Sequence, residues 1–71
     1  MNSKLFRSIM VLHNDTNKTL AEYLKISGQT VCNKINENDT EFKQGEIAMI
    51  IKRYNLSDAQ IKAIFFADLV S

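Results

Sequence analysis

The amino-acid sequence predicts an all-α fold of five helices in one domain, and three observations favour it. The chain of 71 residues has no proline and only two glycines, whereas β folds of this size need frequent turn residues. Apolar residues recur three and four positions apart, which is the spacing of one helix face. Side chains that cap helices precede several of these apolar segments.

The first two helices follow from apolar spacing and caps. The first is expected to start after Ser3 as its cap and to run to about Leu12, and the turn-forming residues 14–17 place the start of the second near Asn17. The small Ala21 in the second helix would let the next helix cross closely. The first helix should bury Leu5, Phe6, Ile9, Met10 and Leu12, and the second Leu20, Ala21 and Leu24.

Ser27 is expected to cap a third helix from Gly28 to about Asn36, followed by a polar loop at residues 36–40. A fourth helix begins after a cap near Lys43, and Phe42 can pack against Ile47 across that cap. Its apolar positions with helical spacing are Ile47, Ile50, Ile51 and Tyr54.

Residues 57–60 have capping-box spacing and predict a fifth helix over about 57–68. Its expected inward residues are Ile61, Ile64 and Phe65. Phe66 would then point elsewhere, so Phe66 with Leu69 and Val70 is interpreted as a dimerisation surface. The alternative is that this end folds back over the first helix of the same chain.

Charge and cysteine content limit the class of protein. The net charge is +1, but residues 1–36 carry five basic against two acidic residues and residues 37–71 carry four against six. The first half could therefore face phosphates while the second turns away. The single Cys32 excludes an internal disulfide, and no membrane-length apolar stretch or signal-peptide core is present, so we expect a soluble, cytoplasmic protein.

The predicted third helix has an outward face rich in amides. If Val31 and Ile35 point to the core, Gln29, Asn33 and Asn36 lie on the opposite side. A carboxamide carries a donor and an acceptor in one plane, which suits the major-groove edge of adenine. A solvated face is the alternative, although asparagine is a poor helix former and two of them favour binding.

The segment from Asp15 to Asn38 resembles the helix-turn-helix of the Cro and phage-repressor family, the Xre-type regulators. The matching residues are Thr16, Leu20, Ala21, Leu24, Ile26, Ser27, Thr30, Val31, Asn33, Lys34, Ile35 and Asn36. Downstream residues similar to short members of this family from phages and mobile elements are Glu41, Phe42, Glu46, Ile47, Asn55, Leu56, Ser57, Asp58, Ile64, Phe65 and Phe66.

The resemblance implies a lambda-repressor-like domain with its helix-turn-helix at about 17–36. It implies base reading by Gly28, Gln29, Cys32 and Asn33, with Ser27 also among the recognition positions that approach base edges. It also implies DNA-backbone contacts from Asn17, Lys18, Ser27, Thr30, Asn36 and Asn38. Asn36 is assigned to the backbone because the carboxyl end of a recognition helix lifts away from the groove floor.

Other reactive side chains favour structural roles. Cys32 is expected to make a small contact to a thymine methyl group or the backbone rather than to sense redox state. His13 suits the end of the first helix, and Glu37, Asp39 and Glu41 lack the glycine and distal glutamate of a calcium loop. We therefore expect no catalytic residue, metal or cofactor.

The sequence predicts a DNA-binding transcriptional regulator in a bacterial host cell. It would act as a homodimer that occupies a palindromic operator and represses by excluding polymerase, without a small-molecule substrate or a membrane. An enzyme is disfavoured because no nucleophile–base pair or phosphate-binding loop is evident. The alternative is a protein-interaction module, similar to an antirepressor, that keeps the fold but binds another regulator; the acidic second half leaves this open.

Overall fold

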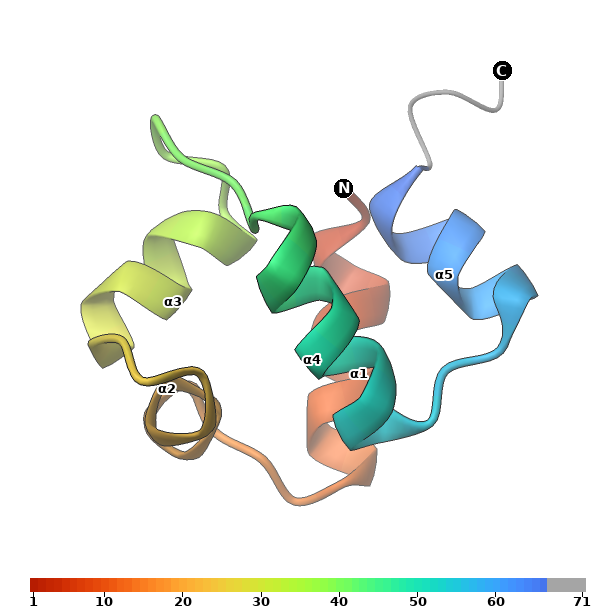
Figure 1. The fold of residues 1–71 in the computed structure, drawn as a ribbon, viewed down its shortest axis with the longest axis horizontal. Coiled ribbons are helices and arrows are strands. Elements are labelled where there is room, and N and C mark those ends of the chain that lie inside the picture. The colour runs from red at the N-terminus through yellow and green to blue at the C-terminus, as the bar shows by residue number, and fades with distance from the viewer. Residues whose placement is uncertain (67–71) are drawn as a thin grey trace.

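Five helices in the expected order make up most of the chain in a computed structural model, which describes residues 1–66 (Figure 1). No strand occurs within these residues, so the all-α prediction is confirmed for them. The helices are α1 (Ser3–Leu12), α2 (Asn17–Leu24), α3 (Gly28–Ile35), α4 (Gln44–Tyr54) and α5 (Asp58–Phe65). None of these helices is both long enough and apolar enough to cross a membrane.

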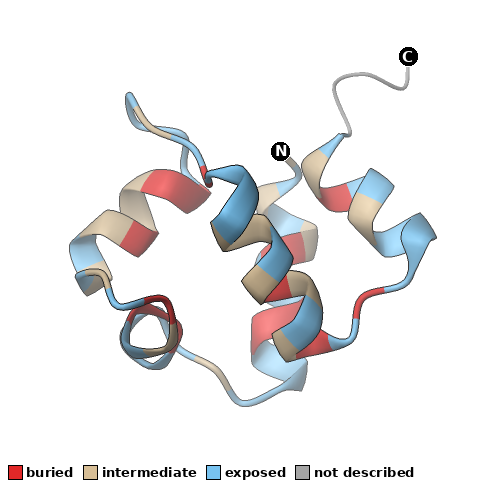
Figure 2. Ribbon diagram, viewed as in Figure 1, coloured by how far each residue is buried: buried red, intermediate tan, exposed pale blue. Residues whose placement is uncertain are grey.

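Every helix contributes to one apolar core, and Figure 2 shows the buried positions turned toward the middle of the molecule. Phe6 of α1 is fully buried and contacts three other rings, with centroid distances of 5.6 Å to Phe42, 6.2 Å to Tyr54 and 6.2 Å to Phe65. The other fully buried large side chains are Leu20, Val31, Ile35, Ile50 and Ile64. Because α2, α3, α4 and α5 each supply at least one of them, the core joins distant parts of the chain.

The apolar face predicted for α1 is wrong at Leu12, which is 79% exposed, and the neighbouring Val11 is also exposed. The buried stripe is Phe6, Ile9 and Met10, at positions i, i+3 and i+4. Leu12 follows Met10 by two positions, or roughly 200° around the helix, and so points to the opposite side.

Most predicted helix starts are confirmed by their caps. The hydroxyl of Ser27 accepts the N–H of Thr30 at 3.1 Å, and Ser57 and Gln60 exchange two hydrogen bonds at the start of α5. α4 begins after Lys43, whose N–H donates to Glu46 at 2.8 Å. α5 is shorter than expected, because Phe66 already forms its C-cap.

The predicted cap of α1 is one residue off. Asn2 is the N-cap, and its side chain accepts the N–H of Leu5 at 3.1 Å. The hydroxyl of Ser3 instead donates to the carbonyl of Ile35 at 2.6 Å, at the end of α3. A carbonyl in the last turn of a helix lacks an intrahelical donor, and Ser3 supplies one across the fold.

α2 and α3 are consecutive helices that are joined by a three-residue connection and pack against each other. Lys25, the first residue of this connection, adopts the left-handed conformation with φ 61°, and the N–H of Ile26 then bonds to the carbonyl of Ala21 at 3.0 Å. Ala21 is buried, as expected for a small residue where two helices meet. Figure 1 shows α2 nearly end-on beside α3, which runs across the view.

Candidate nucleic-acid interface

α3 is anchored by Val31 and Ile35, which are 0% and 1% exposed. The inward orientation predicted for this helix is therefore confirmed. Gln29 is exposed on its outward side, and Asn33 and Cys32 are half-buried beside it. The same surface continues past the helix to Asn36 and Asn38, which are both exposed.

The two amides assigned to base reading bond to each other. Gln29 Nε2 donates to Asn33 Oδ1 at 3.1 Å, one helical turn away. Each carboxamide has two N–H donors and one carbonyl acceptor. The bond therefore leaves the carbonyl oxygen and the second N–H of Gln29 and both N–H groups of Asn33 outside it, on two side chains that restrain one another.

The amino end of α3 carries little side-chain bulk. Ser27 and Thr30 bond through their hydroxyl groups at 2.7 Å, so the hydroxyls of both are engaged within the protein. Gly28 is the first residue of α3, and a Cβ added there would have no atom within 4 Å. Nothing in the fold requires glycine at position 28, and its small size leaves the start of the helix open to close approach.

The carboxyl end of α3 is bonded to α1 in a way the sequence did not predict. A guanidinium N–H of Arg7 donates to Asn36 Oδ1, and Asn36 Nδ2 donates to Cys32 Sγ at 3.5 Å. Asn38 lies just beyond, and its backbone N–H bonds to the carbonyl of Asn33 at 2.8 Å. Arg7 thus belongs to this surface, and its only sequence signal was a positive charge on the outer side of α1.

The start of α2 lies on the other side of Arg7. Asn17 and Lys18 are exposed in the first turn of α2, whose N-cap is Thr16. A shallow hollow of about 190 Å³ separates this turn from α1, and Arg7, Thr16 and Asn17 are among its lining residues. Arg7 therefore bonds to the end of α3 and lines the hollow at the start of α2.

Two charged residues counted in the basic first half are engaged elsewhere. Lys34 is buried, and its ammonium group donates to Glu46 at 2.9 Å and to the carbonyl of Glu41 at 3.2 Å. Asp15 is paired with Arg53. Each pair joins opposite charges from the two halves of the chain. Each half contributes one basic and one acidic residue to the two pairs, so the net charge of its remaining residues is unchanged. The charged residues of the first half outside these pairs are Lys4, Arg7, Lys18, Lys25 and Glu22.

Asp15 is the most heavily bonded carboxylate among residues 1–66. It accepts two hydrogen bonds from Arg53 at 2.7 Å, one from Tyr54 at 2.6 Å and one from Thr19 at 2.6 Å. The bonds from Arg53 hold the pKa of Asp15 well below its usual range, against the opposing effect of burial. Burial, together with the bond to Asp15, raises the pKa of Tyr54 above its usual range.

Glu46 holds the other end of α4. Burial by itself would raise its pKa, but the N–H of Lys43 and the ammonium group of Lys34 outweigh that effect and lower it. Asp15 lies two residues before α2, and Lys34 lies in the last turn of α3. The two ion pairs therefore fasten both ends of the α2–α3 pair to α4.

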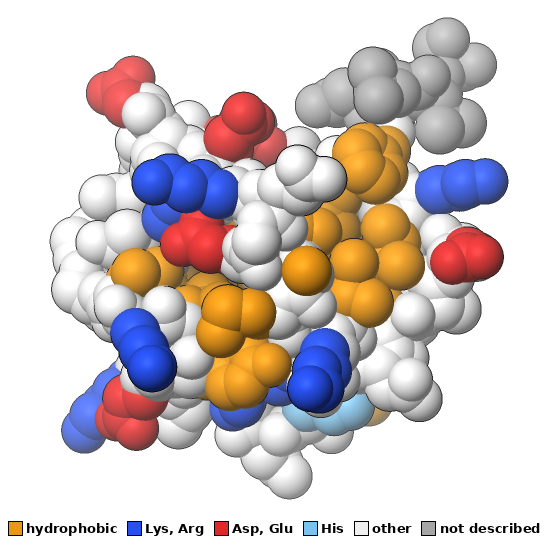
Figure 3. Space-filling model, viewed as in Figure 1, with side chains coloured by type: hydrophobic (Ala, Val, Ile, Leu, Met, Phe, Trp, Pro, Cys, Tyr) orange, Lys and Arg blue, Asp and Glu red, His pale blue; other side chains and the backbone are white. Residues whose placement is uncertain are grey.

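An apolar groove of about 490 Å³ lies between α4 and α5, where Figure 3 shows a continuous hydrophobic area. It is lined by Gln44, Ile47, Ala48, Ile51, Ile61 and Phe66. Phe66 is 43% exposed, and its assignment to an association surface stays a prediction. Leu69 and Val70, assigned to the same surface, lie outside the described residues.

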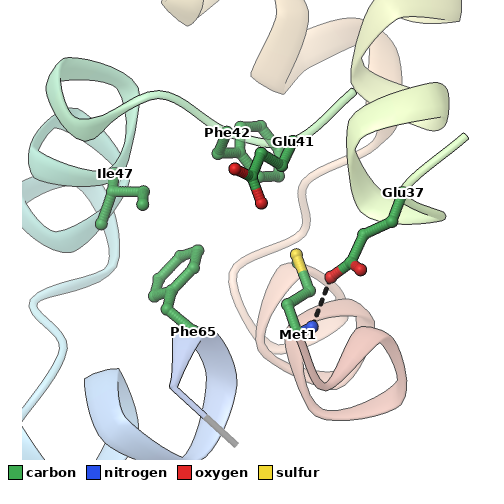
Figure 4. A pocket seen from close by; sticks show the side chains of 6 residues that line it. All are labelled: Met1, Glu37, Glu41, Phe42, Ile47 and Phe65. Carbon is green, nitrogen blue, oxygen red and sulfur yellow. Dashed lines mark hydrogen bonds and ion pairs between the residues drawn. The ribbon is translucent and has the colours of Figure 1, made fainter. Parts of the chain in front are cut away.

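A smaller hollow of about 130 Å³ lies at the amino terminus (Figure 4). Its floor includes Phe42 and Ile47, the two residues expected to pack across the cap of α4, and the ammonium group of Met1 pairs with Glu37 at its rim. No group of three or more histidine, cysteine, aspartate or glutamate side chains within residues 1–66 is arranged to hold a metal ion.

Comparisons with protein-family models, with curated proteins and with solved structures find no match for this chain. The resemblance to Cro and phage repressors therefore stands on the quoted residues alone. What the chain binds has to be inferred from its own contacts, burial and charge.

Proposed function

We propose that this protein is a sequence-specific double-stranded DNA-binding regulator that reads its site with α3. The observation that carries the proposal is the bonded amide pair Gln29–Asn33 on the open side of a helix whose other side is anchored in the core. An amide pair restrained before binding loses less side-chain freedom when it meets a base edge. Gln and Asn are the residue types that bond adenine in two places in the major groove.

The α2–α3 pair would act as a helix-turn-helix. α3 would lie in the major groove with Gly28, Gln29, Cys32 and Asn33 near base edges, and Asn17 and Lys18 of α2 would meet the sugar–phosphate backbone. Three features support this arrangement: the short connection, the packing of α2 against α3, and the open space at Gly28.

A homodimer would place two copies of α3 about 34 Å apart on a palindromic operator. The apolar groove between α4 and α5 supports self-association, because a small domain gains stability by covering such a surface. Its half-exposed Phe66 would be the central contact. Occupation of the operator would repress transcription by excluding polymerase.

Selection of bound duplexes from a random DNA pool, followed by mobility shifts, tests the proposal. A palindromic consensus is expected. Gln29→Ala and Asn33→Ala should each weaken binding to that consensus by ~1–3 kcal/mol while leaving binding to a scrambled duplex almost unchanged. Equal losses on both duplexes, with thermal unfolding unaltered, would exclude base reading by these amides.

A second candidate is a protein-interaction module that binds another regulator, and the apolar groove is the observation that favours it. Salt dependence separates the two candidates. DNA binding that neutralises phosphates weakens steeply as salt rises, whereas an apolar protein contact does not. If the protein binds no DNA duplex at low salt, that result would support the second candidate.

A further inference from the structure

The two arginines of this chain have different surroundings. Arg53 donates two hydrogen bonds to Asp15 and lies 4.6 Å above the ring of Tyr23, so its charge is balanced inside the fold. Arg7 is exposed and bonds to the neutral side chain of Asn36. Among residues 1–66 it has no acidic partner, and its full charge therefore faces outward.

The bond to Asn36 holds the guanidinium group of Arg7 at the carboxyl end of α3. Asn36 bonds in turn to Cys32, which lies next to Asn33 on the proposed reading face. Arg7 also lines the hollow at the start of α2 together with Asn17. The arginine therefore stands between the end of α3 and the start of α2, the two places where a duplex lying on α3 would bring its backbone.

We propose that Arg7 is a phosphate-binding residue of this interface, held in position by Asn36; the proposal rests on the DNA-binding function above. A guanidinium group has five N–H donors in a planar fork that matches phosphate oxygens. One donor bonds Asn36, and the others remain for a phosphate. Because the partner that orients it is an uncharged amide, no carboxylate has to be displaced when DNA binds.

Arg7→Gln tests the proposal through the salt dependence of binding. The plot of log K against log salt has a negative slope, and removal of one phosphate contact makes that slope less steep by ~0.9. Affinity at low salt should fall about tenfold, the range for one charge-assisted hydrogen bond. The loss should be the same on the selected duplex and on a scrambled duplex of equal length, because phosphates carry no sequence information.

Lys62→Gln is the matched control, because it removes the same charge from the exposed side of α5. Its slope should stay close to that of the unaltered protein. Asn36→Ala keeps Arg7 but removes the side chain that orients it. This variant should lose affinity on both duplexes while its slope remains near that of the unaltered protein.

If Arg7→Gln and Lys62→Gln give the same slope while the unaltered protein binds DNA, Arg7 is not a phosphate contact and the DNA-binding function still stands. If the unaltered protein binds neither duplex at low salt, both proposals fail together. If Arg7→Gln reduces the free energy of unfolding by as much as it reduces the free energy of DNA binding, the bond to Asn36 is structural and the proposal is wrong.

Discussion

Two clusters of charged side chains attach the α2–α3 pair to α4, and their carboxylates are bonded in different ways. Asp15 accepts only side-chain donors, from Arg53, Tyr54 and Thr19. Glu46 accepts one side-chain donor from Lys34 and the backbone N–H of Lys43, three residues before it. The first carboxylate joins segments 38 and 39 residues apart, whereas the second partly caps its own helix.

The carboxylate of Asp15 is also the more buried of the two. The side chain of Asp15 is 5% exposed and that of Glu46 is 16% exposed. Three of the four bonds to the more buried Asp15 carboxylate come from side chains 38 and 39 residues away, so this carboxylate depends mainly on the tertiary structure. The comparison implies that the Asp15 cluster sets most of the strength of the attachment, while the Glu46 cluster adds orientation at the end of α3.

Asp15→Ala should have the largest effect on stability. It leaves the guanidinium group of Arg53 and the buried hydroxyl of Tyr54 without their acceptor, and we expect a loss of about 3 kcal/mol in the free energy of unfolding. Chemical denaturation measures this. Glu22→Ala, an exposed acid on α2, is the control and should change stability by less than ~0.5 kcal/mol. If Asp15→Ala lost less free energy of unfolding than Lys34→Met, the ranking of the two clusters would be reversed.

Acid should remove the same stabilisation progressively. The pKa values of Asp15 and Glu46 are lowered in the folded protein. The unfolded chain therefore binds protons first, and stability is present above the unfolded pKa values of about 4 and lost as pH falls through the folded ones. Unfolding measured from pH 7 to pH 2 should show this decline, and Asp15→Asn should flatten it more than Glu46→Gln. An equal effect of the two variants would contradict the comparison.

Lys34→Met should cost less, about 1–2 kcal/mol. Methionine fills the buried space, and Glu46 keeps the N–H of Lys43 and some contact with water. A double-mutant cycle with Glu46→Gln should give a coupling of about 1 kcal/mol. If the two changes are simply additive, the ion pair does not stabilise the end of α3.

Lys25→Gly should give the smallest change, a gain of about 0.5–1 kcal/mol. Lys25 and Asn55 both end helices in the left-handed conformation, with φ 61° and 50°. Glycine adopts this conformation without strain, whereas asparagine already tolerates it. Asn55→Gly should therefore gain less than Lys25→Gly. A loss at Lys25 would mean that the clusters, rather than the turn, set the geometry of the α2–α3 pair.

Most helix starts were predictable because a cap is a local feature. Ser27, Lys43 and Ser57 stand where the sequence places them, since each acts on residues within one turn. Ser3 was misassigned because its hydroxyl is used 32 residues away, on the carbonyl of Ile35. Leu12 was misassigned because a strongly apolar residue outside the buried stripe looks the same in sequence as one inside it.

The amide face of α3 was also predictable, because the helical repeat alone relates Val31 and Ile35 to Gln29 and Asn33. The place of Arg7 was not. Its partner Asn36 is 29 residues away, and the angle at which α1 passes α3 decides whether the two side chains meet. Residues at such separations carry no signal of contact in a single sequence.

The sequence by itself determined the helices, most of their caps and most of the buried side of each helix, because periodicity and capping act within a few residues. Only the tertiary structure decided which charges are paired inside and which face outward. Lys34 and Arg7 are both basic residues of the first half, yet one is buried against Glu46 and the other lies exposed beside α3. The reason is physical: the environment of a charge depends on helices that the chain brings together from far apart.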